Sequence, residues 1–322
     1  MIDQNARVFH EKVIIKHLTH EFAKDLRKQG KDYFGDSGVL DQGIRYETLK
    51  AIGLTPRATR LVAFHTEDNR PIGFLCLEEN TNWLFSIKFV FVNPKYRKKG
   101  VATRLLNYAI ILAKEKGAKK VNLNVWPPKT STINLYGKMG FKELGCTFLV
   151  QGYLSGNSPL EMARRMVMGL GLLTKFKLGK KNQLFQSEIN SKKNREKIFS
   201  LYQRCVDQNW QEFFEVNAKN LMNGSRHVWQ PPFFKHILIN DTANSFALIF
   251  SRPFSQKATV EIYNTSEAVV PSLLEDLLKI LVKKGIFITK ITLFNKIDSR
   301  TSNWIAQKNM KIFRFKAMGK IL

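Results

Sequence analysis

A short loop between an apolar strand and an amphipathic helix holds the residues best suited to bind a ligand. Residues 89–92 are Phe-Val-Phe-Val, and residues 97–100 are Arg-Lys-Lys-Gly. The first turn of a helix leaves backbone N–H groups unpaired at the positive end of the helix dipole, and together these bind phosphate. Gly100 lets the backbone come close to such an anion. The pattern therefore predicts a site for a diphosphate-containing cofactor.

The predicted contacts run from the end of this strand into the first turn of the helix. The cations beside Gly100 supply charge, and the small side chain of Ala102 leaves room for the phosphate. An ordinary basic loop also contains a glycine and a few cations, so this run needs support from elsewhere in the sequence. The predicted cofactor-binding residues are Phe91, Val92, Arg97, Lys98, Lys99, Gly100, Val101, Ala102 and Thr103.

Two motifs in this half resemble those of a known enzyme family. The run 97–102, Arg-Lys-Lys-Gly-Val-Ala, is similar to the acetyl-CoA signature R-x-x-G-x-A of the GNAT superfamily of N-acetyltransferases. Residues 133–141, Ile-Asn-Leu-Tyr-Gly-Lys-Met-Gly-Phe, resemble the family's LY-x-x-x-GF element. The two motifs follow each other in the expected order, and the resemblance covers residues 12–154.

The resemblance implies how acetyl-CoA and the catalytic groups are arranged. The sheet is expected to open between the strand that ends near Val92 and the strand 121–126, with the pantetheine arm of acetyl-CoA in that gap. Tyr136 fits the family's acid, which protonates the leaving thiolate; the alternative is a buried aromatic with a hydrogen-bonded hydroxyl. Asn124 and Lys129 stand where family members that acetylate protein N-termini often have Glu and Asn, so the general base is left unassigned.

An acidic window at residues 32–47 is the predicted entry for the amine that accepts the acetyl group. It contains four carboxylates and one arginine, in a chain whose net charge of +26 repels a cationic substrate. The resemblance places this window between the first two helices, a region that commonly lines the acceptor site. The candidates for substrate binding are Asp36, Asp41 and Glu47. Solvated carboxylates in turns are the alternative, and Glu78-Glu79 is the next acidic pair.

The elements that must position these residues alternate between strands and helices. Apolar residues at helical spacing predict a helix over 101–116, and Gly117 is a typical stop. The other expected elements of the first half are strands at 13–18, 60–65, 71–77, 83–92 and 121–126, two helices within 20–54, a helix at 131–139 and a closing hairpin over 141–153.

The second half repeats this order of elements without the two motifs. Residues 264–271 read Asn-Thr-Ser-Glu-Ala-Val-Val-Pro, with neither arginine nor glycine, and residues 303–310 lack the tyrosine and the Gly-Phe pair. The order predicts a tandem duplication whose second copy binds no cofactor. The expected elements are strands at 184–189, 233–239, 246–251, 259–263, 288–294 and 312–315 and helices at 194–207, 212–222, 273–284 and 302–309.

The predicted fold class is α/β (α+β), with two tandem GNAT-like domains, each a mixed, mostly antiparallel sheet flanked by helices. The predicted domains are a catalytic, acetyl-CoA-binding domain at 1–154, a linker with one helix at 155–182 and a degenerate domain at 183–322. These domains and the motifs favour an N-acetyltransferase that moves the acetyl group of acetyl-CoA to a primary amine of a protein or small molecule by direct attack.

The charge leaves a second class of function open. The chain has 52 Lys and Arg against 26 Asp and Glu, with a pI near 10.0, which attracts nucleic acid as well as anionic cofactors. The alternative is a basic nucleic-acid- or ribosome-associated module with a vestigial or accessory GNAT domain. Trp210 and Trp229, and the pair Phe233 and Phe234, are aromatic side chains that would stack on bases if they are not part of the core.

The remaining composition gives expectations about metals and location. The three cysteines have no paired spacing and no histidine cluster beside them, so no metal is assigned. No apolar run is long enough for a transmembrane segment, and residues 1–12 lack the apolar region of a secretory signal. We expect a cytoplasmic protein. The sequence carries no signal for the acceptor's identity or for the oligomeric state.

Overall fold

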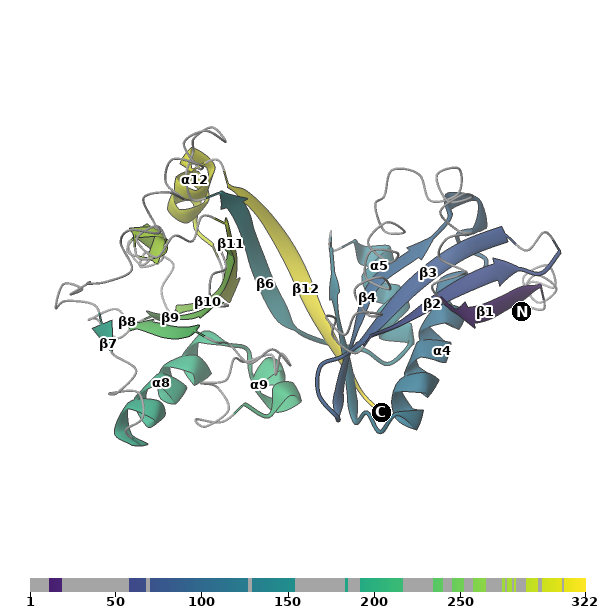
Figure 1. The fold of residues 1–322 in the computed structure, drawn as a ribbon, viewed down its shortest axis with the longest axis horizontal. Helices are drawn as coiled ribbons and strands as arrows, with labels where there is room; N and C mark the ends of the chain where they lie inside the picture. Colours follow the sequence, from purple (N-terminus) through teal and green to yellow (C-terminus); the bar gives the residue numbers. More distant parts are fainter. Residues whose placement is uncertain are drawn as a thin grey trace. The chain divides into compact units, whose positions relative to one another are not determined.

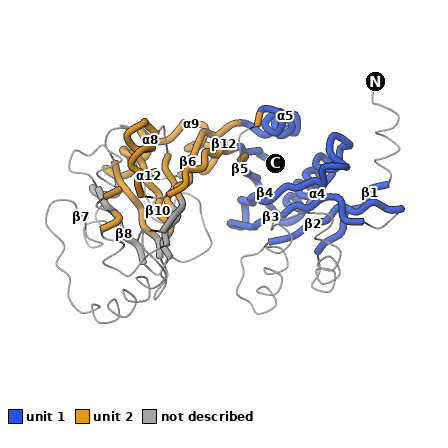
Figure 2. Tube along the Cα trace, turned by 90° about the horizontal axis from the view of Figure 1, so that it is seen from above, with its two compact units in different colours: residues 1–124, 130–142, 318–322 blue, residues 125–129, 143–317 orange. Residues whose placement is uncertain are grey.

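The chain forms two compact units that exchange segments (Figure 2). Unit 1 consists of Met1–Asn124, Thr130–Lys142 and Met318–Leu322, and unit 2 of Val125–Lys129 and Glu143–Ala317. The computed structural model describes residues 12–18, 58–67, 70–126, 129–153, 183–184, 192–216, 234–239, 245–251, 257–264, 274–275, 277–279, 281, 288–294, 297–308 and 310–322.

Unit 1 is built on a mixed, mostly antiparallel sheet (Figure 1). The first four strands pair antiparallel in chain order, and the fourth and fifth pair parallel. In the strand order the final strand, β12, follows β5, and its last residues, from Met318 on, belong to unit 1. This arrangement confirms the predicted fold class for the first half. The strands are β1 (Val13–His17), β2 (Ala58–His65), β3 (Arg70–Glu79), β4 (Leu84–Val92), β5 (Lys120–Val125) and β12 (Lys311–Ile321).

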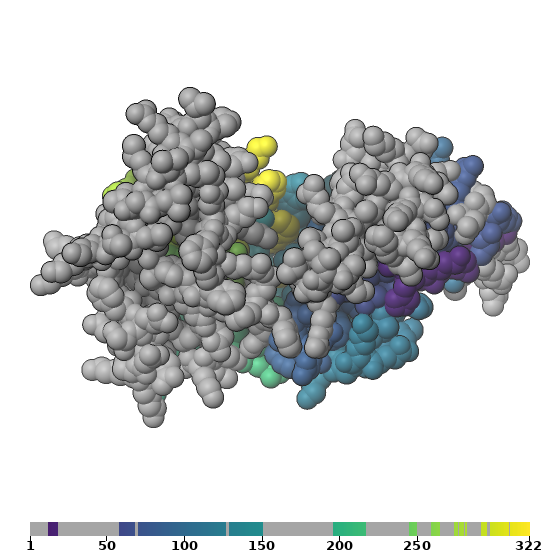
Figure 3. Space-filling view, in the orientation of Figure 1, coloured from purple at the N-terminus to yellow at the C-terminus, as the bar shows by residue number. Residues whose placement is uncertain are grey.

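Helix α4 (Val101–Glu115) packs on the sheet of unit 1 through the apolar face that the spacing predicts. The helix lies at the surface in Figure 3. Its side chains Tyr108 and Ile111 are exposed. Gly117, with φ of 82°, ends the helix in the left-handed conformation that glycine adopts without strain. The buried residues of the helix are Val101, Leu105, Leu106, Ala109, Ile110 and Ala113.

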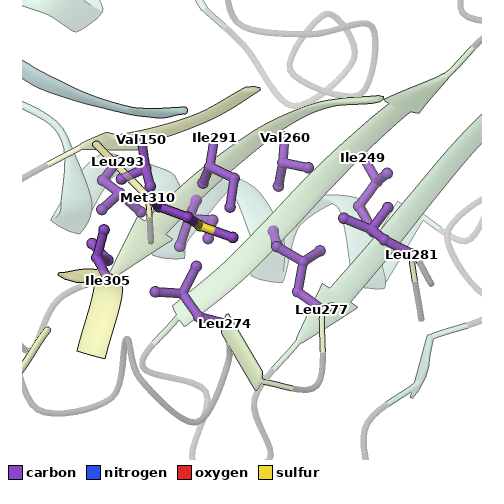
Figure 4. Packing of buried hydrophobic residues seen from close by; sticks show 12 residues of the cluster. Val150, Ile249, Val260, Leu274, Leu277, Leu281, Ile291, Leu293, Ile305 and Met310 are labelled. Atoms are coloured by element: carbon purple, nitrogen blue, oxygen red, sulfur yellow. The ribbon is translucent and has the colours of Figure 1, made fainter. Parts of the chain in front are cut away.

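Unit 2 has helices on both faces of its sheet. Helical residues 274–275, 277–279 and 281, together with helix α12, cover an apolar core on one face (Figure 4). Helix α8 packs on β9 and β10. Strands β8, β9 and β10 pair antiparallel, β10 and β11 pair parallel, and β11 and β6 pair antiparallel. The elements are β6 (Lys142–Tyr153), β7 (Gln183–Leu184), α8 (Lys192–Cys205), α9 (Gln208–Phe214), β8 (Phe234–Ile239), β9 (Ser245–Ser251), β10 (Lys257–Asn264), β11 (Ile288–Phe294) and α12 (Ser299–Gln307).

Three local predictions were wrong. The expected hairpin over 141–153 is one twelve-residue strand, β6, which pairs with β11 rather than folding back on itself. The final strand extends over Lys311–Ile321 instead of 312–315. Helix α9 ends at Phe214, before the predicted 222, because Glu215 adopts a left-handed conformation with φ of 49°. The lengths of the two strands are set by pairing with segments far away in the sequence, which the local pattern of apolar residues does not reveal.

The strand pattern of unit 2 repeats that of unit 1. In each unit an antiparallel series ends in one parallel pair, β4 with β5 and β10 with β11. The units do not follow the predicted consecutive domains 1–154 and 183–322, because most of β6 lies in unit 2 and residues 318–322 lie in unit 1. The predicted linker at 155–182 lies outside the described residues.

Candidate active site

The loop between β4 and α4 is held in place by its own polar groups. Asn93 donates its backbone N–H to Ile72 O on β3 at 2.9 Å, and its side chain caps the single helical turn η2 (Pro94–Tyr96). Arg97 Nε donates to Val92 O at 3.1 Å and bends back over the end of β4. The sequence therefore builds a loop whose start is attached to the sheet and whose cations follow directly.

Helix α4 begins without a side-chain cap. Gly100, with φ of 78°, is the N-cap residue and makes no side-chain hydrogen bond, and Lys98 is also left-handed, with φ of 61°. The first helical hydrogen bond runs from Arg104 N to Gly100 O at 3.0 Å. The amides of residues 101–103 consequently have no partner within the helix. They lie at the positive end of the helix dipole, beside three lysine and arginine side chains, which makes this helix start a candidate anion-binding site.

A glycine on the neighbouring strand sets how closely α4 approaches the sheet. A Cβ atom added to Gly73 would lie 3.0 Å from Leu105 Cδ1, 3.1 Å from Val101 Cγ1 and 3.2 Å from Phe91 O. A side chain at this position would require these neighbours to move by a few tenths of an ångström. Gly73 thus helps to position the anion site, and sequence reasoning missed it, although a glycine inside an apolar strand is a recognised sign of close backbone approach.

The sheet opens beside this loop. The parallel register of β4 with β5 ends at Ile87 opposite Leu123, although β4 continues to Val92. In the register with β3, Leu75 lies opposite two residues, and one of them, Phe89, has φ of 50° and an exposed side chain. Such a bulge in a bulky residue is a strained feature that commonly marks a functional site. The opening agrees with the expected gap, but the apolar run 89–92 gave no signal for the bulge.

Tyr136 lies near the end of helix α5 (Thr130–Lys138), which closes with a Schellman motif. Phe141 N donates to Tyr136 O at 3.0 Å, and Gly140 N donates to Gly137 O at 2.9 Å. Gly140 is left-handed, with φ of 83°, and the ring of Phe141 contacts the ring of Tyr136 edge to face at 5.9 Å. The Gly-Phe pair of the second motif therefore has a physical purpose: it terminates the helix and packs against the tyrosine.

Burial changes the acidity of this tyrosine. Only 7% of the Tyr136 side chain is exposed, and desolvation raises its pKa from 10.0 to about 12. The phenol therefore keeps its proton to a higher pH than a free tyrosine does.

The structure describes some of the other predicted site residues and not others. The predicted cofactor residues run from the end of β4 into the first turn of α4, and all of them are exposed or half-buried except Val101, of which only 1% is exposed, backbone included. Asn124 and Lys129 are both exposed. The substrate candidates Asp36, Asp41 and Glu47 lie outside the described residues.

A match to a known family agrees with this geometry. The sequence profile of the acetyltransferase (GNAT) family matches residues 21–141, which include the loop, the start of α4 and Tyr136. The matched segment therefore belongs to the GNAT family. An uncharacterized N-acetyltransferase of Methanocaldococcus jannaschii is 32% identical to this GNAT segment over 84 residues. That alignment covers 24% of this chain and 36% of the relative, so the chain matches about a third of that protein's length.

A solved structure resembles this chain over almost its full length. The crystal structure of a GCN5-related N-acetyltransferase from Sphaerobacter thermophilus has a TM-score of 0.52 and 11% identity and covers 96% of both chains. At this identity the likeness concerns the fold alone. A second structure, of an acetyltransferase from Pyrococcus horikoshii, has a TM-score of 0.45 and 14% identity and covers 97% of this chain and 90% of that one. Among the described residues, no helix is both long and apolar enough to cross a membrane.

Proposed function

We propose that this chain is an acetyl-CoA-dependent N-acetyltransferase that transfers the acetyl group to a primary amine of a protein or a small molecule. The observation that carries the proposal is the uncapped start of α4. Three amides without a helical partner lie beside the exposed side chains of Arg97, Lys98 and Lys99. A pyrophosphate supplies the acceptors and the negative charge that this arrangement lacks.

The open edge of β4 provides the place for the rest of acetyl-CoA. Beyond Ile87 the strand is no longer in register with β5, so an extended pantetheine arm has backbone groups to bind. This placement puts the thioester near the bulge at Phe89 and the diphosphate at residues 101–103. Membership of the matched segment in the GNAT family supports the same orientation.

The proposed reaction is a direct attack without an acyl-enzyme. The neutral amine nitrogen bonds to the thioester carbon, the carbon–sulfur bond breaks, and the sulfur leaves as a thiolate that takes up a proton. We assign that proton to Tyr136. Because burial makes the phenol a weaker acid than free tyrosine, its main effect is a hydrogen bond that strengthens as charge develops on the sulfur. The proton lost by the amine goes to a base that is not assigned.

The acceptor is proposed to enter beside the acidic window of the sequence. Asp36, Asp41 and Glu47 remain the candidates for holding its ammonium group. Of the alternative pair, Glu78 lies 3.8 Å from Lys88 Nζ, which reduces its value for a second cation. Once an acceptor is known, Asp36→Asn, Asp41→Asn and Glu47→Gln are expected to lower its kcat/KM. Unchanged values in all three variants would move the acceptor elsewhere.

The second half is proposed to be a GNAT-like copy that binds no cofactor. Its repeated strand pattern supports common ancestry, and its sequence after β10 lacks the arginines and glycine of the first loop. In unit 2 the strand equivalent to β4 is β10, which carries the buried ring of Tyr263. This ring stacks between those of Phe246 and Phe294, with ring centroids 4.7 and 4.5 Å apart. Trp210 is also buried against Phe294, so it is unavailable for stacking on a nucleic acid.

Calorimetry with acetyl-CoA tests the cofactor assignment directly. We expect one molecule bound per chain and release of CoA when pooled amines and peptides are added. Absence of binding would refute the proposed function. A stoichiometry of two would leave the first site in place but show that the second half also binds the cofactor.

A further inference from the structure

The final strand brings a lysine from the far part of the sequence to the helix that carries Tyr136. Lys320 Nζ donates to Met139 O, the carbonyl just after α5, at 2.6 Å across 181 residues of sequence. Residues 318–322 belong to the same compact unit as α5. Leu322 N also donates to Lys119 O, next to the start of β5, at 2.9 Å. Two hydrogen bonds therefore fix the end of β12 in the unit that contains the candidate site.

Lys320 supplies a hydrogen-bond donor for a backbone carbonyl at the end of α5. The Schellman motif uses the carbonyls of Tyr136 and Gly137 and leaves the carbonyl of Met139 without a helical donor. The ammonium group of Lys320 satisfies that oxygen and lies at the negative end of the helix dipole. A cation at this point stabilises the last turn, in which Tyr136 is the third residue from the end of the helix.

The last turn matters because α5 is short. A helix of nine residues has little stability of its own in water and depends on its packing and its caps. The ring of Tyr136 is held against Phe141, which is the third residue after the end of the helix. If the cap loosens, the backbone that orients the tyrosine and the ring that packs on it move together. Displacements of about 1 Å at a catalytic group are enough to slow a reaction about a hundredfold.

We propose that Lys320 is a positioning residue for Tyr136, so that β12, which begins in unit 2, is a working part of the catalytic unit. The inference rests on the proposed function, in which Tyr136 protonates the thiolate. Lys320 touches neither substrate in this scheme. It acts by holding the helix end in one conformation.

The test compares four variants of the full chain by steady-state kinetics and hydrogen exchange. Lys320→Met removes the ammonium group, Lys320→Gln keeps a neutral donor, and Lys320→Arg keeps the charge. Lys316→Met is the matched control, because this lysine lies on the same strand but pairs with Glu143 at 2.8 Å in unit 2. We expect Lys320→Met to lower kcat about fivefold to tenfold, with the Kd for acetyl-CoA changed by less than about twofold.

The graded variants separate a positioning role from a general loss of stability. Lys320→Arg is expected to restore kcat to within about twofold of the wild type, and Lys320→Gln to fall between. Amides of residues 139–141 should exchange faster in Lys320→Met but not in Lys316→Met. Equal losses of kcat in the Lys316 and Lys320 variants, or a loss of acetyl-CoA affinity that parallels kcat, would overturn the inference.

Tyr136→Phe, measured beside these variants, separates the role of Tyr136 as the acid from the role of Lys320 in positioning it. An inactive Tyr136→Phe with a fully active Lys320→Met leaves the proposed function in place and refutes the role of Lys320. A fully active Tyr136→Phe removes the proposed acid itself. Should Lys320→Met be insoluble, the ratio of kcat between Lys320→Gln and Lys320→Arg carries the same test, and a ratio of one refutes the proposal.

Discussion

Replacement of Gly100 by valine tests the anion site at the start of α4. Gly100 has φ of 78° and ψ of 0°, a conformation that costs a residue with a side chain about 1 to 2 kcal/mol, and a β-branched residue falls at the upper end. The added side chain also stands where the phosphate must approach the backbone. We expect Gly100→Val to raise the Kd for acetyl-CoA at least about tenfold, which corresponds to about 1.4 kcal/mol.

The other end of the same helix provides a matched control. Gly117 has φ of 82°, and a Cβ atom added there has no neighbour within 4 Å. Gly117→Val therefore introduces similar backbone strain about 24 Å from Gly100, far from the loop. Both variants should lose about 2 kcal/mol or less in the free energy of unfolding, measured with denaturant.

Only the variant at the loop should lose affinity for acetyl-CoA in calorimetry. If Gly100→Val binds acetyl-CoA as the wild type does while folded, the loop does not bind the phosphates. If Gly117→Val loses affinity to the same extent, the effect of Gly100→Val reflects strain in the helix rather than the site.

Three further predictions concern individual side chains. Because the pKa of Tyr136 is raised from 10.0 to about 12, folding holds its proton while the unfolded chain releases it. The contribution of Tyr136 to the free energy of unfolding should therefore fall by about 2 to 3 kcal/mol between these pH values. Because burial also raises the pKa values of Tyr202 and Cys205, the variant Tyr136→Phe should still lose stability as the pH rises, but by about this amount less than the wild type. Tyr136→Phe should also lower kcat far more than acetyl-CoA affinity. A pH dependence identical in the variant would contradict the buried phenol. Gly73→Ala should weaken acetyl-CoA binding about threefold to tenfold. The reason is that the added Cβ lies 3.2 Å from Phe91 O, a backbone atom that moves only together with its strand. Unchanged affinity in calorimetry would show that α4 adjusts freely. Of the three cysteines, half-buried Cys146 should react first with a thiol reagent in the folded chain, because Cys76 and Cys205 are buried. Burial also raises the pKa of the Cys205 thiol to about 12. Mass spectrometry of the labelled peptides checks this order.

The anion site follows from local sequence because all its parts are neighbours in the chain. A helix start, a left-handed glycine and three cations lie within residues 97–103, and backbone geometry alone makes such a segment bind anions. The same holds for Tyr136, since the Gly-Phe pair that terminates its helix follows within five residues. Gly73 and the bulge at Phe89 were not predicted, because the role of each depends on contacts with residues that are distant in the sequence. Gly73 lies against helix α4, and the bulge is defined by the register of β4 with β3.

The arrangement of the strands could be predicted only in part. The alternation of apolar runs gave the mixed sheet of the first half, because strands β1 to β4 pair with their neighbours in the chain. Strands β6 and β12 have partners far away in the sequence, and a hydrophobic pattern records which face of a strand is buried but not which strand lies beside it. The sequence by itself predicted an anion-binding loop and determined the strand and the helix that carry it. Only the tertiary structure decided that β12 passes into unit 1 and places Lys320 at the end of α5, because that contact joins groups 181 residues apart.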